Sequence, residues 1–409
     1  MAPCSAARTV GGMHHEPTQS PFRDDGRAEV VIVGGGVAAL EAMIALSDLA
    51  PHRVHVTLVA PDPDFVYRPL KIGESFGVGQ RTHHPLARAA GDFGASIVAG
   101  AVGSVDPAAR EVHCAGGRVL PYDSLIVAVG ARAVPAFAHA ETIGDDAADE
   151  MLHGILADLE EGYLKRVAFV VPSCAVWSLP LYELALLTAV DAWSMGIDDA
   201  RLLVVSAEER PLWLFGPSAS ASVERLLERR GIEFIGGAHA EVRRGELVLT
   251  PGGRRLPVQR TFALPVLQGP ALAGLPCDAH GFIAVDEHGR VAGLDGVFAA
   301  GDVTTFPIKQ GGIAAQQAEA AAQAVAERHG CAVEPEPFRP QLRGRLITGD
   351  EDLFLRHEIA GGGGDGAAGP RALWWPPTKI AARRLAPYLF GVAEAERMDL
   401  AHVTELPVG

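Results

Sequence analysis

The feature that most constrains the fold is an apolar stretch, Val30–Val33, that runs into three glycines, Gly34 to Gly36, and then into a helix-forming segment. A strand, a tight glycine turn and a helix in this order can hold the pyrophosphate of a dinucleotide, because the helix N-terminus presents unpaired N–H groups to the phosphates. Gly34 allows the tight turn, Gly36 lets the backbone approach the phosphates, and Ala39 stands at the third small position. A glycine turn without a ligand is the alternative. The flanking strand and helix favour binding, with contacts expected from Gly34, Gly36, Val37, Ala38 and Ala39.

A second segment, 295–302, reads Asp-Gly-Val-Phe-Ala-Ala-Gly-Asp and ends at Gly301 and Asp302. It matches the other half of an FAD site. Each segment alone is a weak signal. Together, and in this order along the chain, they predict a protein that binds FAD.

Composition bounds the remaining possibilities. A chain of 409 residues with 48% hydrophobic residues can form two or three domains with cores. A net charge of -15 argues against a nucleic-acid partner, since phosphate binding needs clustered Lys and Arg. The five cysteines form no Cys-x-x-Cys pair, so we expect no metal site. Their odd, scattered distribution fits a reducing cytoplasm, and no apolar run is long enough to predict a transmembrane helix.

Alternating strand and helix patterns predict an α/β fold with two Rossmann-like domains, the second inserted in the first, plus a C-terminal α+β cap. We expect a loop over 61–82, a single strand over 97–105 and a strand over 282–285. The predicted divisions are a disordered tail (1–27), the first part of the FAD-binding domain (28–135), an inserted NAD(P)-like domain (136–274), the second part of the FAD-binding domain (275–330) and a cap or interface region (331–409).

Four segments carry a resemblance to the flavin disulfide-reductase superfamily, closest to its sulfide:quinone oxidoreductase and type II NADH dehydrogenase branch. Residues 120–131 resemble the crossover between the two domains, and 301–302 resemble the terminal FAD motif. Residues 65–70 and 307–313 resemble segments that line the flavin in that branch. The resemblance covers about residues 29–330.

The resemblance implies specific roles in holding the cofactor. Asp302 would contact the ribityl chain or a nearby phosphate, although a helix or turn cap is the alternative for this residue. Lys309 and the N-terminus of the following helix would stabilise negative charge on the reduced flavin ring, and an ordinary surface lysine is the alternative. The further residues expected at the cofactor are Arg68, Pro69, Gly130, Gly301, Gly311, Gly312 and Ile313.

The acidic residue that usually binds the adenosine ribose is missing at the end of the second strand. Ala60 occupies that place. Asp62 or Asp64 could reach the ribose from the following loop, or backbone groups could serve instead.

The second nucleotide-binding unit departs from the family pattern. After the strand 166–171, the residues Pro172 to Pro180 contain no glycine, and Trp177 stands where a pyrophosphate would need close backbone approach. This argues against ordinary NAD(P)H docking. The resemblance includes a Pro-x-Tyr-Glu motif at 180–183, but the reactive cysteine pair of sulfide:quinone oxidoreductases is not matched. Cys174 is a candidate reactive thiol near a helix N-terminus, and a small buried cysteine is the alternative.

The C-terminal region joins Trp374 and Trp375 to a short basic helix. Such a helix suits a membrane surface, and quinone reductases of this branch use a similar tail. Packing over the flavin pocket or in a homodimer interface is the alternative. We therefore expect a cytoplasmic protein, with membrane association as a further option.

The functional expectation is an FAD-dependent oxidoreductase of the sulfide:quinone or NADH:quinone type with altered donor specificity and a small-molecule or quinone acceptor. One alternative is an NAD(P)H:acceptor reductase with an atypical nucleotide pocket. Another is a flavin-binding redox sensor or partner subunit whose catalytic site has decayed.

Overall fold

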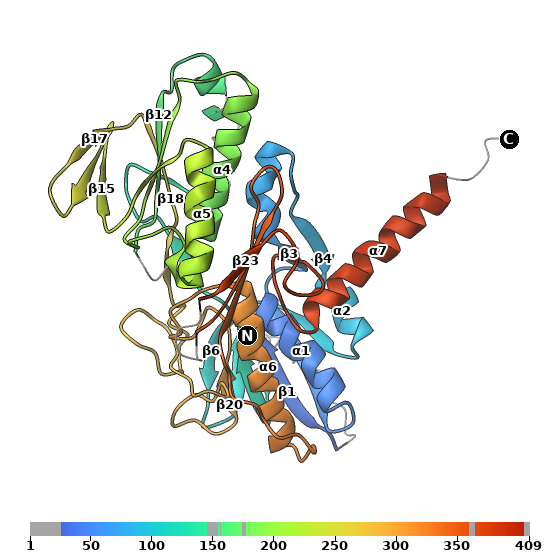
Figure 1. Cartoon of the computed structure of the whole chain (residues 1–409). Helices are drawn as coiled ribbons and strands as arrows, with labels where there is room; N and C mark the ends of the chain where they lie inside the picture. The colour runs from blue at the N-terminus through green and yellow to red at the C-terminus, as the bar shows by residue number, and fades with distance from the viewer. Residues whose placement is uncertain (1–25, 145–153, 156, 174–176, 360–364, 405–409) are drawn as a thin grey trace, which may run out of the picture.

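A computed structural model describes residues 26–144, 154–155, 157–173, 177–359 and 365–404 (Figure 1). It contains two separate parallel sheets, each flanked by helices, with a small antiparallel sheet from the C-terminal region beside both. The α/β class and the two-sheet architecture predicted from the sequence are confirmed.

The first sheet has the strand order β20-β9-β1-β2-β5, and every neighbouring pair is parallel. Its central strands are buried on both faces, which explains why they read as continuous apolar runs without alternation. The strands are β1 (Ala28–Val33), β2 (Val54–Ala60), β5 (Ser96–Ala99), β9 (Ser124–Val127) and β20 (Val297–Ala299), and the associated helices are α1 (Val37–Leu49), α2 (Leu86–Asp92) and α6 (Gly311–Arg328).

The second sheet, β11-β18-β12-β13-β14, is also parallel and is built entirely from residues between the two parts of the first. Its elements are β11 (Glu141–Thr142), β12 (Arg166–Val170), α4 (Leu179–Ser194), β13 (Arg201–Val205), η2 (Trp213–Phe215), α5 (Pro217–Arg229), β14 (Glu233–Ile235) and β18 (Arg260–Ala263). A pair of short antiparallel strands, β10 (Arg132–Val134) and β19 (Val266–Gln268), joins the outgoing and returning chain. The limits of the domains remain a prediction.

The two domains also contain two small antiparallel sheets of three strands each. One consists of β6 (Val102–Asp106), β7 (Glu111–Cys114) and β8 (Val119–Pro121). The other consists of β15 (His239–Arg243), β16 (Glu246–Thr250) and β17 (Arg255–Pro257). The single strand expected over 97–105 is therefore two strands, because β5 pairs with β2 and β6 pairs with β7.

The segment expected to be a loop, 61–82, is instead structured. β3 (Asp64–Tyr67) pairs with β4 (Thr82–Pro85), and the 3-10 helix η1 (Arg68–Phe76) lies between them. The prediction of a strand over 282–285 was also wrong, since Ile283 and Val285 make only isolated β-bridges. The helix expected near 145–162 lies partly outside the described residues.

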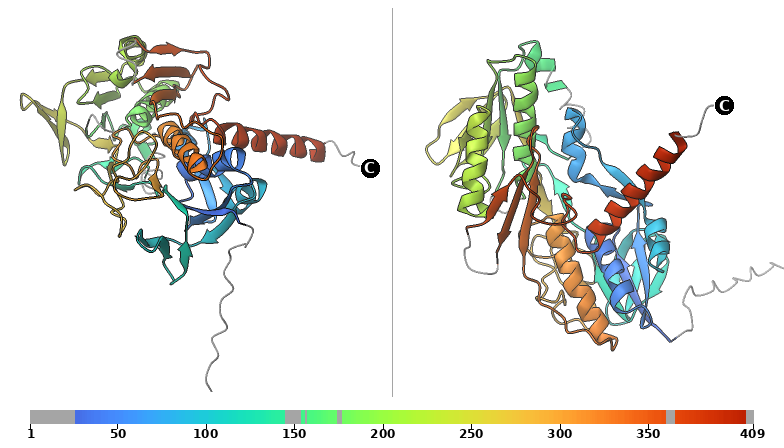
Figure 2. Two further views of the ribbon diagram at one scale, coloured as in Figure 1. Left: turned by 90° about the horizontal axis from the view of Figure 1, so that it is seen from below. Right: turned by 45° about the vertical axis from the view of Figure 1, so that its right-hand side comes forward.

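The C-terminal region forms a three-stranded sheet, β21 (Gln341–Leu346), β22 (Leu353–Glu358) and β23 (Ala367–Gly369), followed by the helix α7 (Leu385–Thr404). This sheet contributes Leu342, Leu346 and Leu355 to the core of the inserted domain. α7 was expected to be short but has 20 residues, and both views in Figure 2 show it pointing away from the rest of the chain. No helix among the described residues has the length and apolar character needed to cross a membrane.

Candidate functional site

A cavity of about 580 Å³ lies where all five strands of the first sheet end. Gly34, Pro61, Gly100, Ala128 and Ala300 directly follow β1, β2, β5, β9 and β20, and all five line it. Ligands of open α/β sheets bind in the crevice at the carboxyl ends of the strands. The volume is within the usual range for cofactor sites, about 300–1,000 Å³. Most of the predicted cofactor residues line this cavity: Gly34, Gly36, Val37, Ala38, Ala60, Arg68, Pro69, Gly130, Gly301, Asp302 and Gly311.

The glycine turn has the geometry that a pyrophosphate requires. Gly34 has a φ of +128°, and a Cβ there would lie 2.2 Å from the Ala128 carbonyl oxygen, so no other residue fits. At Gly36, by contrast, no atom lies within 4 Å of the Cβ position. Gly36 begins α1 without a side-chain cap, and the first turn contains no acidic residue. The amides of that turn are therefore available to a phosphate, and the residues present fit a dinucleotide.

The turn that carries Asp302 is held by α6. Gln317 on α6 accepts the Gly301 N–H through its side-chain oxygen at 2.8 Å, and the Thr304 hydroxyl donates to the Gly301 carbonyl at 3.0 Å. A Cβ at Gly301 would lie 3.1 Å from the Ala38 side chain, so glycine lets this turn pass over the start of α1. Burial raises the pKa of the Asp302 carboxyl, and Lys309 opposes that shift. No motif in the sequence pointed to this role of Gln317.

The part of the cavity next to the end of β2 contains both acidic candidates for the ribose. Asp62 and Asp64 line the cavity, as do Ala60, Gly100 and Val102. Contact of either carboxylate with an adenosine ribose stays a prediction.

Lys309 lies near Asp302 but does not line the cavity. Its ammonium donates to the Thr304 carbonyl and sits 4.0 Å from the centroid of the Phe282 ring. Burial lowers the pKa of Lys309 to about 8, and Asp302 and Asp278 oppose this shift. Its predicted role at the flavin ring stays a prediction.

Three further expected residues do not reach the cavity. Ala39 is fully buried against the sheet, as its third-glycine position requires. The Ile313 N–H donates to the side chain of Gln310, which caps α6, and the Ile313 side chain belongs to the core of the inserted domain. Gly312 contacts that same Gln310 side chain. Gln310 therefore takes an amide of the α6 N-terminus that we had assigned to the cofactor.

A second cavity, of about 370 Å³, adjoins the first and is called here the α7 cavity. Ile380 lines both cavities, and Tyr67 and Leu70 of the α7 cavity flank Arg68 and Pro69 of the first. One wall is apolar and comes from α7. The lining residues are Tyr67, Leu70, Thr82, His83, His84, Arg345, Thr378, Lys379, Ile380, Leu385, Ala386, Leu389, Phe390 and Ala393.

Lys379, at the edge of the α7 cavity, forms a buried ion pair with Glu183 of the 180–183 motif. The side chains are 6% and 1% exposed. Glu183 also accepts the Ile347 N–H at 2.9 Å. Burial raises the pKa of Glu183, and Lys379 opposes the shift. The pair ties α4 of the inserted domain to the C-terminal region.

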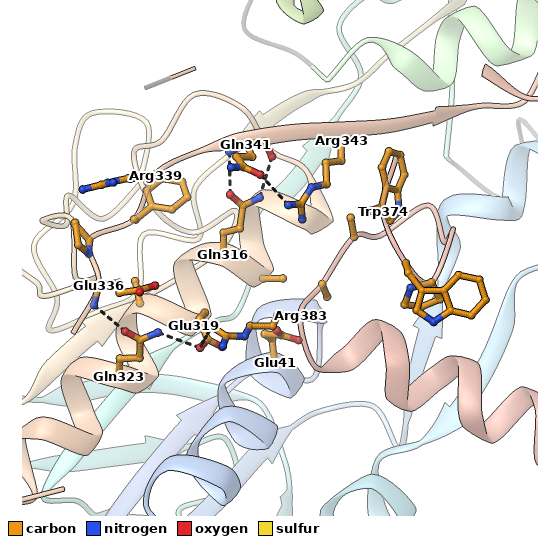
Figure 3. A pocket seen from close by; sticks show the side chains of 18 residues that line it. Glu41, Gln316, Glu319, Gln323, Glu336, Arg339, Gln341, Arg343, Trp374 and Arg383 are labelled. Carbon is orange, nitrogen blue, oxygen red and sulfur yellow. Dashed lines mark hydrogen bonds and ion pairs between the residues drawn. The ribbon is translucent and has the colours of Figure 1, made fainter. Parts of the chain in front are cut away.

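A third cavity, of about 610 Å³, is lined by residues of α6 and of the C-terminal region (Figure 3). Its polar side chains mostly bond to one another. Gln316 exchanges hydrogen bonds with the backbone of Gln341, and the Gln341 side chain accepts from Arg343. Gln323 donates to Glu319 and accepts the Glu336 N–H. Because these groups already have partners, we assign no cofactor to this cavity.

The N-terminus of α4, where a nucleotide is expected in the inserted domain, packs against the C-terminal region. Leu179, at the N-terminus of α4, is 2% exposed. A Cβ at Gly344 of β21 would lie 2.6 Å from the Leu179 side chain and 2.7 Å from the Phe215 ring, so the C-terminal sheet contacts this helix end directly. Trp177 packs edge-on against Phe215 with 5.7 Å between ring centroids. The first residue of α4 is thus packed against the C-terminal sheet, and the loss of ordinary NAD(P)H docking stays a prediction.

None of the described cysteines lines the first cavity or the α7 cavity. Cys114 is buried, and burial raises the pKa of its thiol; Cys277 is exposed and Cys331 is intermediate. Cys174, the candidate reactive thiol, lies outside the described residues.

Comparison with known proteins fits this geometry. The chain is 27% identical over 375 residues to the ferredoxin reductase component of chlorobenzene dioxygenase from Cupriavidus sp. (strain PS12), covering 83% of this chain and 85% of the relative. It is 24% identical over 299 residues to the sulfide-quinone reductase of Aquifex aeolicus (strain VF5), covering 68% and 69%.

Solved structures show the same fold. The sulfide:quinone oxidoreductase of Aquifex aeolicus superposes with a TM-score of 0.74 at 19% identity, covering 84% of this chain and 86% of that one. The ferredoxin reductase for the CYP199A2 system of Rhodopseudomonas palustris gives a TM-score of 0.62 at 20% identity, covering 82% and 83%. The sequence profile of the pyridine nucleotide-disulphide oxidoreductases matches residues 28–166 and 184–327. The chain therefore belongs to the pyridine nucleotide-disulphide oxidoreductase family and is an FAD-dependent oxidoreductase.

Proposed function

We propose that this protein passes electrons through FAD to a small quinone-type acceptor bound in the α7 cavity, and that its electron donor is not NAD(P)H. The observation that carries the proposal is that Ile380 lines both cavities. An acceptor in the α7 cavity would be separated from the FAD-binding cavity by one side chain.

The α7 cavity suits a ring with few polar atoms. Leu385, Leu389 and Phe390 of α7 form its apolar wall, while its polar groups come from β3, β4, β21 and the segment before α7. Small-molecule sites commonly combine an apolar lining with a few placed polar groups. The similarity to a sulfide-quinone reductase supports the same choice of acceptor.

The inserted domain supports a donor other than NAD(P)H. A dinucleotide needs the N-terminus of α4, and there the Leu179 side chain packs against Gly344 of the C-terminal sheet. Sulfide capture by a pair of thiols near the flavin finds no support among the described cysteines, because none of them lines the cavity.

Anaerobic stopped-flow spectroscopy tests the proposal in two halves. Protein reduced with dithionite should be reoxidised by 1,4-naphthoquinone at a rate that saturates with quinone concentration. Micromolar NADH or NADPH should reduce the oxidised flavin only slowly. Rapid bleaching by either nucleotide would overturn the donor assignment, and a linear, non-saturating dependence on quinone would overturn the acceptor site.

A matched pair of variants on α7 locates the acceptor. Ala386 lines the α7 cavity and is 3% exposed, whereas Ala395 is exposed on the same helix. Ala386→Phe should fill the cavity and slow reoxidation by naphthoquinone, with FAD content unchanged. Ala395→Phe should leave both unchanged. Equal rates in the two variants would place the acceptor elsewhere.

A second candidate is reduction of a protein acceptor such as a ferredoxin, with NAD(P)H as donor. It is favoured by the match to a ferredoxin reductase component across 83% of this chain. Reoxidation of the reduced protein by a [2Fe–2S] ferredoxin, faster than by naphthoquinone and sensitive to ionic strength, would support it over the first proposal.

The location of the protein follows as a further proposal. A cytoplasmic protein whose α7 lies on a membrane surface would take a lipid-soluble quinone directly into the α7 cavity. Flotation with liposomes tests this, and size-exclusion chromatography tests the homodimer considered from the sequence.

A further inference from the structure

We infer that the Tyr67 hydroxyl is the hydrogen-bond donor that binds and polarises a carbonyl oxygen of the acceptor in the α7 cavity. The inference rests on the proposed function and adds to it the group that recognises the acceptor. Tyr67 ends β3, lines the α7 cavity and lies next to Ile380, which separates this cavity from that of the cofactor.

The hydroxyl of Tyr67 is held in place as an acceptor, but its own proton is donated to no other described residue. Its oxygen accepts the Ile380 N–H at 3.1 Å, which fixes the position of the phenol. Among the described residues, no acceptor for the Tyr67 O–H is found. A phenol that accepts one hydrogen bond still has one to donate. Burial raises the pKa of Tyr67, so the hydroxyl keeps its proton at neutral pH.

The other polar groups of the cavity already have partners. Lys379 pairs with Glu183, and Arg345 donates to Asp352 at 2.7 Å and to the Pro377 carbonyl at 3.1 Å. Thr378 donates to the Ile380 carbonyl at 2.8 Å. His84 bonds to Thr82 at 3.0 Å, and His83 lies 3.7 Å from Asp64. Lys379 and Arg345 keep further N–H donors, but both are anchored to carboxylates. Tyr67 differs from them because its hydroxyl is neutral, has no acceptor among the described residues and is held beside Ile380.

The chemistry of quinone reduction needs such a donor. Two electrons and two protons convert both carbonyl groups to hydroxyls, so negative charge develops on oxygen as each C=O double bond becomes a single bond. The electrons come from the reduced flavin of the proposed function, and the protons come from water at the cavity mouth. A fixed donor aimed at the oxygen stabilises the charge as it develops. Tyr67 keeps its own proton and thus acts throughout as a hydrogen-bond donor.

The test compares two ligands of one shape on two matched variants of the FAD-loaded protein. 1,4-Naphthoquinone carries the carbonyl groups and naphthalene does not. Tyr67→Phe removes the donor, and Tyr388→Phe makes the same change on α7, where the hydroxyl bonds Asp92 at 2.8 Å outside the cavity lining. Dissociation constants are measured by calorimetry with the flavin oxidised, and reoxidation rates by stopped flow.

We expect Tyr67→Phe to weaken naphthoquinone binding about tenfold, the loss typical of one hydrogen bond, and to leave naphthalene binding unchanged. Tyr388→Phe should change neither. Equal weakening of both ligands would show that Tyr67 only shapes the cavity through Ile380, and unchanged naphthoquinone binding would show that it donates nothing; either result overturns the inference. If the unmodified protein binds naphthoquinone nowhere, the proposed function itself fails.

Discussion

At the scale of single residues, the buried ion pair of Lys379 and Glu183 should be sensitive to substitution. The two charges are almost fully removed from water, and each compensates the other. Breaking a buried pair leaves one uncompensated charge, which typically costs about 3–5 kcal/mol.

Lys379→Met should therefore lower the thermal unfolding midpoint strongly, and adding Glu183→Leu should restore much of the loss because no charge then remains buried. Lys165→Met is the matched control, since Lys165 pairs with Asp199 on the surface and should change the midpoint little. Differential scanning calorimetry measures the unfolding midpoints of these variants. A Lys379→Met protein as stable as the parent would mean that Glu183 becomes protonated at little cost.

Glu208 gives stability a dependence on pH. It follows β13, accepts the Leu214 N–H at 3.2 Å, and burial raises its pKa to about 7. The folded state thus binds more protons than the unfolded state between about pH 4.5 and 7, and the stability from this group falls as pH rises through that range.

Glu208→Gln removes this titration. Relative to the parent, the variant should gain about 1–3 kcal/mol of stability on going from pH 5 to pH 8. Denaturant titrations at the two pH values measure the difference. A difference between parent and variant that stays constant with pH would mean that the Glu208 carboxyl is solvated and titrates normally.

Lys309 tests the placement of the segment 307–313. If its ammonium acts on the flavin, Lys309→Met should lower the reduction potential by some tens of millivolts while FAD stays bound. This corresponds to about 1–3 kcal/mol for a partly buried charge, at about 30 mV per 1.4 kcal/mol. Spectroelectrochemical titration provides the value, with Lys165→Met as the control. An unchanged reduction potential would mean that Lys309 does not act on the flavin and serves only its contacts with Thr304 and Phe282.

At the scale of elements, the turn between β1 and α1 contains one glycine that the fold requires and another that cofactor binding requires. Gly34 is required by its φ of +128° and by the Ala128 carbonyl, whereas Gly36 has an ordinary φ of -92° and open space where a side chain would stand. The first glycine therefore serves the fold, and the second leaves room for the phosphates.

Two single substitutions should show this division. Gly36→Ala should leave the unfolding midpoint of the apoprotein unchanged and weaken FAD at least tenfold, because the methyl group enters the space that the pyrophosphate would occupy. Gly34→Ala should lower the apoprotein midpoint. Thermal unfolding and FAD titration measure both quantities. If the Gly36→Ala protein still bound FAD tightly, the pyrophosphate would have to bind somewhere other than this turn.

The start of α7 shows how one element positions another. Glu41 of α1 is fully buried and accepts the N–H groups of Arg384 and Leu385, at 2.9 and 2.7 Å. Arg384 also bonds Asp48 and Glu319. A carboxylate from one helix thus caps another that begins more than three hundred residues later. The base of α7 is fixed to the cofactor domain, although its far end projects freely in Figure 2.

At the scale of the whole molecule, the sequence predicted the parts with strong local patterns and missed those formed by distant contacts. The end of the second strand was predicted at Ala60, and β2 ends there, because the strand is a run of seven consecutive buried residues. The β3–β4 hairpin was missed, because each strand has only four residues and the two strands pair across the intervening helix η1. Ile380 and Gln317 have no motif of their own. Only the folded chain brings them to the site.

The cavity for FAD is also spread over nearly the whole chain, since its walls run from Gly34 to Ile380. During synthesis the N-terminal part leaves the ribosome first. The glycine turn is then made first, and its opposite walls, the Gly301–Asp302 turn and Ile380, are added only after more than 250 further residues. A nascent chain stalled before residue 300 lacks these walls and should therefore release any flavin it had met.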